Sequence, residues 1–217
     1  MSLSPNEFQH TVDLMRGTIE PDSVLTAMQD FFRQEFDCEL YDYFADTLPE
    51  GGNRLRYVIW DSEAGESFFI HTETFYGRDK EKENKIKEEF SRLCRQENIL
   101  DSFHDPHEYF AVATEIADEL RTNIQHQAEK EIRHYLETIP QICRYEFFFD
   151  TVHVFYQSDE DIERHHKDGL SQAISNRILE LKKPYDEFNA LVDSGTCFSS
   201  IQTLNEKYEG NVFYYFR

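Results

Sequence analysis

The chain has 217 residues, of which 39% are hydrophobic and 15% aromatic, and it carries a formal net charge of −21 from 43 acidic and 22 basic side chains. This apolar content is enough for a packed core, which excludes an acidic disordered chain. The charge repels nucleic-acid phosphates and anionic lipid, so it argues against both kinds of partner. The charge serves solubility in a bacterial-type cytoplasm, or it forms a surface that recognises a basic partner or mimics a polyanion.

The first third of the chain predicts two helices and then an antiparallel meander. Apolar residues at helical spacing, with an aromatic stripe on the second helix, indicate the helices. Period-two patterning and the turn cluster Pro49–Gly52 indicate the strands. The expected elements are a helix from Pro5 to Gly17, a helix that starts at Asp22 or Ser23 and includes Phe36, and strands over 38–44, 55–60 and 67–75.

The middle of the chain predicts two more helices. A charged helix over 79–96 has a narrow apolar stripe, which is typical of a surface helix. A long helix from Glu108 to Glu137, with an apolar residue at nearly every turn, ends before Pro140. Its length suggests a connection between two halves.

The last third predicts a hairpin, helices and a final strand. A tight turn at Asp150–Thr151 separates two β-rich runs, and Ser158–Asp161 is typical of a helix start. The expected elements are strands over 142–149 and 152–156, a helix from 158 to 182, a short helix over 185–191, another short helix after the turn at 194–195, and a strand over 211–216.

These elements predict an α+β fold in which antiparallel sheet is packed by amphipathic helices. We expect a single domain over 1–217. The order of elements is similar in the two halves, and Tyr57–Glu63 matches His153–Asp159 in hydrophobicity. An internal duplication with halves of about 5–105 and 107–217 accounts for this similarity, although two unrelated strand-and-turn segments would look the same.

The cysteines and the N-terminus indicate a reducing cytoplasm. The four cysteines lack the close pairing of thiolate metal sites, so we expect separate buried thiols. The N-terminus has neither a basic nor an apolar signal region, and the longest apolar runs are too short to cross a bilayer. The cysteines are Cys38, Cys94, Cys143 and Cys197.

Two Glu-x-x-His pairs are the most interesting candidates for chemistry. Glu131 with His134, and Glu163 with His166, have the spacing found in helical di-iron sites. Such sites face the interior of a helical bundle. His134 lies off the apolar stripe of its helix, and a predicted hairpin separates the pairs, so we predict no metal site.

The Glu163/His166 pair is either structural or functional. We expect His166 to be partly buried and the neighbouring His165 to be exposed. This expectation rests on the apolar face that a continuous helix would give to Ile162, Leu170 and Ala173.

Other histidines and the last cysteine favour structural roles. His104 and His107 flank Asp105–Pro106, which is typical of a turn that starts a helix. His71 falls on a predicted strand. Cys197 follows the turn at 194–195, and we expect its side chain to be buried and to serve only in packing. No nucleotide-binding or nucleophile-elbow motif is present, so we predict no cofactor.

The C-terminal segment Asn211–Arg217 has aromatic residues on both faces of its predicted strand. Such a strand is central, covered, or an exposed edge that invites a partner. In the last case the protein would form a homo-oligomer through this strand.

These observations favour a non-enzymatic interaction or regulatory module that binds a basic protein partner and acts by occlusion. One alternative is a hydrolase that depends on a metal or on histidine and acidic side chains. It predicts a pocket that gathers Glu163 and His166 or the His104/His107 loop. A second alternative is a structural homo-oligomer subunit.

Overall fold

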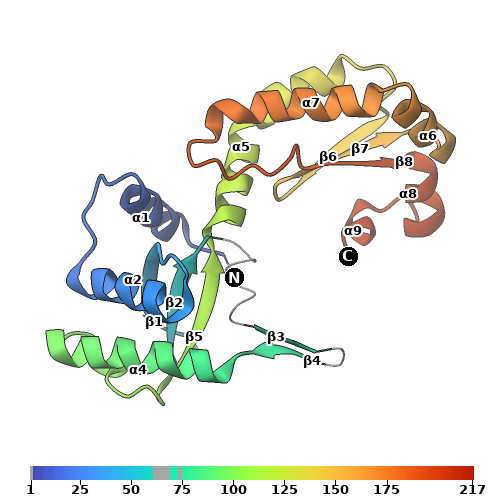
Figure 1. Ribbon diagram of the computed structural model, residues 1–217. Helices are drawn as coiled ribbons and strands as arrows, with labels where there is room; N and C mark the ends of the chain where they lie inside the picture. The colour runs from blue at the N-terminus through green and yellow to red at the C-terminus, as the bar shows by residue number, and fades with distance from the viewer. Residues whose placement is uncertain (1, 61–68, 73–74) are drawn as a thin grey trace. The chain divides into compact units, whose positions relative to one another are not determined.

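The computed structural model describes residues 2–60, 69–72 and 75–217 and shows an α+β protein, as predicted (Figure 1). The chain divides into two compact units, residues 1–119 and 120–217. Across these described ranges, no helix has the length and apolar character needed to cross a membrane.

The first unit begins with two capped helices, both predicted. Ser4 and Glu7 form a capping box at α1 (Pro5–Met15), in which the Ser4 amide donates to Glu7 Oε2 at 2.8 Å. Asp22 caps α2 (Ser23–Phe36) by accepting from the Leu25 amide at 2.6 Å. Local hydrogen bonds therefore fix where both helices start.

A mixed sheet follows, in the order β1-β2-β5. Strand β1 (Asp42–Thr47) is antiparallel to β2 (Asn53–Ile59), and β2 is parallel to β5 (Tyr109–Glu115). β3 (Phe69–Thr72) and β4 (Phe75–Arg78) form a separate antiparallel hairpin. The predicted meander is thus wrong in its third strand, and residues 67, 68, 73 and 74 of the expected strand lie outside the described residues.

The prediction of one helix over 108–137 is wrong in its first part. Tyr109–Glu115 is a strand, and helix α5 (Ile116–Glu137) begins only after it. Tyr109 and Ala111 alternate with more exposed residues and are buried against the core, as strand geometry requires. A short apolar strand that runs directly into an apolar helical stripe has no boundary visible in the sequence.

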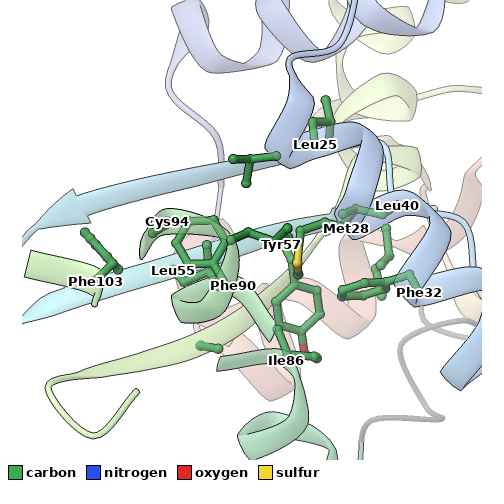
Figure 2. Packing of buried hydrophobic residues seen from close by; sticks show 14 of the residues in the cluster. Leu25, Met28, Phe32, Leu40, Leu55, Tyr57, Ile86, Phe90, Cys94 and Phe103 are labelled. Atoms are coloured by element: carbon green, nitrogen blue, oxygen red, sulfur yellow. The ribbon is translucent and has the colours of Figure 1, made fainter. Parts of the chain in front are cut away.

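Helices α2 and α4 (Lys80–Glu97) cover one face of the first sheet and bury an aromatic core (Figure 2). Phe32 from α2 and Phe90 from α4 are fully buried, and the Phe32 ring lies 5.4 Å from that of Tyr57 on β2. The apolar stripes predicted on both helices are therefore used for packing. The short helix η1 (Asp101–Phe103) adds Phe103 to this core.

The second unit contains a mixed sheet in the order β6-β7-β8. The predicted hairpin is present as β6 (Arg144–Phe148) and β7 (Thr151–Tyr156), and β8 (Thr196–Ser200) pairs in parallel with β7. Buried residues of α5 and α7 (Leu170–Lys182) pack on one sheet face. The other elements are α6 (Asp159–Lys167), η2 (Lys183–Tyr185), α8 (Ile201–Tyr208) and α9 (Val212–Tyr215).

Three predictions for the second unit need correction. The helix over 158–182 breaks at Gly169, whose φ of +86° ends α6. The short helix over 185–191 is only the turn η2 followed by a loop. Strand β8, which follows the turn at 194–195, was not expected, because its parallel partner β7 is more than 40 residues away in sequence.

The predicted strand over 211–216 is also wrong. Asn211 caps α9 by accepting from the Phe213 amide at 2.9 Å, so the aromatic run starts as a helical turn. The ring of Phe216 stacks on that of Phe148 at 4.4 Å. The expected edge strand is absent from this segment, and a homo-oligomer stays a prediction.

Both sheets have the same connectivity, since a hairpin is followed by a helical crossover to a parallel third strand. The internal duplication and the single domain over 1–217 stay predictions.

Candidate functional site

The segment of residues 97–108, here called the acidic loop, runs from the last residue of α4 to the start of β5 in the first unit. It contains the predicted histidine pair. The His107 amide donates to Asp105 Oδ1 at 2.9 Å, which confirms the predicted turn, although a strand follows it and not a helix. The ring of His104 hydrogen-bonds through Nε2 to the carbonyl oxygen of Ile99 at 2.9 Å. The pair therefore organises the loop's own backbone.

A buried aromatic anchor fixes the acidic loop to the core. Phe103 is 2% exposed, and its ring lies 4.9 Å from that of Tyr109 and 5.9 Å from that of Phe90 (Figure 2). The hydroxyl of Ser91 donates to the carbonyl oxygen of Phe103 at 2.7 Å. The middle of the loop is thus held by both packing and a buried hydrogen bond.

Two more hydrogen bonds tie down the loop's backbone. Asn53 Nδ2 on β2 donates to the carbonyl oxygen of Ser102 at 3.1 Å. The guanidinium of Arg95 on α4 donates to the carbonyl oxygen of His104. A loop fixed in this way loses little conformational freedom when it binds a partner.

The acidic loop combines exposed charge with exposed apolar surface. It contains no lysine or arginine. Ile99 and Leu100 are 39% and 37% exposed, and no other large apolar residue described in the first unit is as exposed. Exposed apolar side chains rimmed by charge are typical of protein-binding sites. The acidic side chains, all exposed, are Glu97, Asp101, Asp105 and Glu108.

The backbone at Leu100 is strained. Its φ of +50° places it in the left-handed region, which costs a non-glycine residue roughly 1–2 kcal/mol. Glycine or asparagine is the usual residue in this region. A half-exposed leucine there is a feature that core packing does not explain, and strain of this kind is found at functional loops.

The negative charge is concentrated in the same unit. Residues 1–119 contain 27 acidic and 11 basic side chains, a net charge of −16, whereas residues 120–217 contain 16 and 11, a net charge of −5. The field around the first unit therefore favours a cationic partner much more than that around the second.

A buried carboxylate orients a histidine elsewhere in the first unit. Asp42 on β1 is 1% exposed and accepts hydrogen bonds from Thr11 Oγ1 and from His10 Nδ1, both at 2.8 Å. Burial raises the pKa of Asp42, and the hydrogen bonds from His10 and Thr11 act in the opposite direction. Sequence reasoning missed this pair because its members are 32 residues apart.

The His10–Asp42 pair has the geometry of a general base and its orienting carboxylate. The ring of His10 also contacts that of Phe44 edge to face, with the ring centres 6.2 Å apart. The hydroxyl of Thr11 and the ring of His10 bond the same oxygen of Asp42. In its present setting the pair connects α1 to the first sheet.

The same sheet face holds a second charged network. Arg56 on β2 is 4% exposed, and its guanidinium binds Glu7 on α1 and, at 3.2 Å, Asp46 on β1. Hydrogen bonds from Arg54 and Arg56 lower the pKa of Asp46. Burial acts to raise the pKa of Glu7, but its bonds to Arg56 and Ser4 outweigh burial and lower it. This network is structural, since all its charges are paired.

In neither Glu-x-x-His pair does a described hydrogen bond or ion pair join the glutamate to its histidine. Glu163 is 77% exposed and lies 3.6 Å from Lys167 Nζ, and His166 is exposed as well. His134 is exposed, as predicted from its place off the apolar stripe, and Glu131 accepts from the Tyr185 hydroxyl at 3.2 Å. Within the described ranges, no three His, Cys, Asp or Glu side chains are grouped to hold a metal ion.

The predicted burial of the histidines on α6 is reversed. His165 is 5% exposed, its ring lies 4.9 Å from that of Tyr156, and its Nδ1 bonds Asp168 Oδ2 at 2.9 Å. The prediction extended one helix through Leu170, but the break at Gly169 separates Leu170 from the face of α6.

The cysteines are all free thiols. Cys38 and Cys94 are buried as predicted, and burial raises the pKa of Cys94 to about 11. The prediction is wrong for Cys143, which is exposed, and Cys197 is half-buried. The strand position of His71 is confirmed by its pairing with Tyr76, and the surroundings of its side chain lie outside the described residues.

Compared with known proteins, the chain matches no family model, no curated protein and no solved structure, so only its own residues identify the candidate site.

Proposed function

We propose that the protein is a non-enzymatic interaction module, and that the acidic loop is the site where a basic protein partner docks. The observation that carries this proposal is the loop itself: four exposed carboxylates and two exposed apolar residues on a backbone anchored by Phe103. The charge of the first unit supports it, because a net −16 speeds the approach of a cationic partner.

The charged and the apolar side chains of the acidic loop would have different roles in binding. The carboxylates attract and orient lysine and arginine side chains, a contribution that salt screens. Ile99 and Leu100 provide the desolvated apolar contact on which most of the affinity of such interfaces depends. The partner would be inactivated or sequestered by occlusion, with no chemical step.

Removal of three loop charges is expected to reduce partner capture at least tenfold. The variant combines Glu97→Gln, Asp101→Asn and Glu108→Gln, and it leaves Asp105 intact because that side chain holds the turn. Wild-type protein immobilised in native lysate should retain a basic protein at low salt and release it at high salt. The variant should retain at least tenfold less of the same protein at low salt, as measured by quantitative mass spectrometry.

A matched variant separates the loop from the overall charge. Glu160→Gln, Glu163→Gln and Glu206→Gln change net charge by the same amount through exposed residues of the second unit. This control should capture the partner as well as wild type does. Equal losses in both variants would show that only bulk charge matters, and the acidic loop would then not be the site.

The strain at Leu100 allows a test in which stability and binding separate. Leu100→Gly relieves the left-handed strain, while the added freedom of the unfolded chain costs roughly 0.5–1 kcal/mol. The free energy of unfolding in urea should therefore stay within about 1 kcal/mol of wild type. Partner capture should fall several-fold, because an apolar contact is lost. A variant that is much less stable would place Leu100 in the core and not in an interface.

A further inference from the structure

Lys182, the last residue of α7, is a buried lysine in the second unit. Its side chain is 1% exposed. Its Nζ donates to two main-chain carbonyl oxygens, those of Asp150 in the β6–β7 turn and of Ser194 just before β8, both at 2.8 Å. An amine held in this way has a fixed position and two defined acceptors.

The two acceptors match the needs of a neutral amine. An ammonium group has three N–H donors, whereas a neutral amine has two and a lone pair. Both donors of neutral Lys182 are satisfied by the carbonyls of Asp150 and Ser194, so neither hydrogen bond uses the lone pair. Burial lowers the pKa of Lys182 from 10.5 to about 8, with the nearby charges of Asp150 and Asp193 acting in the opposite direction.

Lys182 also lines a cavity of about 230 Å³. Leu191 and Val192 form part of the wall, and Val192 is 86% exposed, so the cavity opens at the surface loop. Gly195 keeps the space around the nitrogen open, since a Cβ there would lie 3.1 Å from Nζ and 2.5 Å from the carbonyl oxygen of Asp150. The volume is below that of sites for drug-sized ligands, so it suits a group of only a few atoms.

We propose that Lys182 is an acylation site that accepts a short acyl group from an uncharged thioester. The amine lone pair attacks the thioester carbonyl carbon, the N–C bond forms, the C–S bond breaks, and the thiolate leaves while the amine proton passes to solvent. The product is a neutral amide that keeps one N–H for one of the two carbonyl acceptors. Its alkyl end has Leu191 and Val192 as apolar neighbours.

The charges around the cavity select the type of acyl donor. When Lys182 is neutral, the charged groups at the cavity are Arg121 on α5, which lies 3.6 Å from Asp150, and the carboxylates of Asp150 and Asp193. Their sum is −1, which repels an anionic donor such as an acyl phosphate. An uncharged thioester meets no such barrier.

The test is acetylation of the full-length protein at pH 8 with S-acetyl-N-acetylcysteamine as the thioester. Lys183 is exposed and adjacent, so it is a matched internal control. About half of the Lys182 amine is neutral at this pH, because its pKa is about 8. Peptide mapping after cleavage at acidic residues should show Lys182 acetylated at least tenfold faster than Lys183.

Two comparisons make the result decisive. In urea the difference between the two lysines should disappear, which would attribute the preference to the fold. Acetyl phosphate should modify Lys182 less than the thioester does. Acetylation of native Lys182 at a rate equal to or below that of Lys183 would overturn the proposal, and a preference of Lys182 for acetyl phosphate would overturn the choice of donor.

Discussion

Replacing Arg56 by methionine is expected to lower the free energy of unfolding by about 2–3 kcal/mol. The guanidinium is 4% exposed, and it is the buried partner of both Glu7 and Asp46. Its loss leaves Glu7 without a counter-charge and removes one of the two arginines that bind Asp46, which keeps its ion pair with Arg54. The effect stays below the upper range for buried pairs because both carboxylates are partly exposed to water. Urea denaturation of wild type and variant measures it directly.

The effect of Arg56→Met should depend on pH in one direction. The pKa of Glu7, which is bound by Arg56, is lowered in the folded state, so this pairing stabilises the protein above the ordinary pKa of 4.5 and is lost as the pH falls through the lowered value. The difference in free energy of unfolding between wild type and Arg56→Met should therefore become smaller at acidic pH.

Arg33 on α2 provides a control for this substitution. It is half exposed, and its ion pairs with Asp30 and Glu39 are open to solvent. Arg33→Met should change stability by less than about 0.5 kcal/mol. If the two arginine variants were equally stable, the network around Arg56 would not contribute to the fold.

Replacing Lys182 by methionine is expected to lower the free energy of unfolding by about 2–4 kcal/mol at pH 8. The change removes both hydrogen bonds of Nζ and leaves the partly buried carbonyls of Asp150 and Ser194 without their donor. These bonds join the β6–β7 turn to the segment that leads into β8, so their loss affects the pairing of the second sheet. Lys183→Met, at an exposed neighbour, should have almost no effect.

The contribution of Lys182 to stability should grow with pH. Its pKa is about 8 in the folded state and near 10.5 in the unfolded chain, so between these values the unfolded state binds more protons. The stability of wild type relative to Lys182→Met should rise by up to about 3 kcal/mol over this window. If the difference in free energy of unfolding between wild type and Lys182→Met stayed constant or became smaller from pH 8 to 10.5, Lys182 would keep its charge in the folded protein.

The sequence predicts correctly those elements whose ends are set by nearby residues, such as helix caps and tight turns. Asp22 marked the start of α2, Ser158 that of α6, and the hairpin of β6 and β7 was read from its two β-rich runs. The elements missed depend on distant partners. β5 and β8 are third strands that pair in parallel after long crossovers, and no residue near either one indicates this pairing.

The C-terminal error has a different cause. Asn211–Phe216 is rich in aromatic residues, which favour strands on average. The Asn211 cap and the stacking of Phe216 on Phe148 stabilise a helical turn instead. Tertiary contacts therefore override local preference here.

The candidate site was visible in the sequence only in part. Its acidic residues and the His104/His107 turn could be read directly, but the exposure of Ile99 and Leu100 could not, because apolar residues are normally expected inside. The left-handed backbone at Leu100 and the two acceptors of Lys182 are three-dimensional facts with no sequence pattern.

The most direct test of the proposed function is site-specific photo-crosslinking in native lysate. A photoreactive amino acid is placed at Leu100 in the acidic loop and, as a control, at Val192, which is more exposed but lies in the second unit. We predict a crosslink from position 100 to a lysine- or arginine-rich surface of one basic protein, with none from position 192. Equal crosslinking from both positions, or none from position 100, would contradict the assignment of the acidic loop as the docking site.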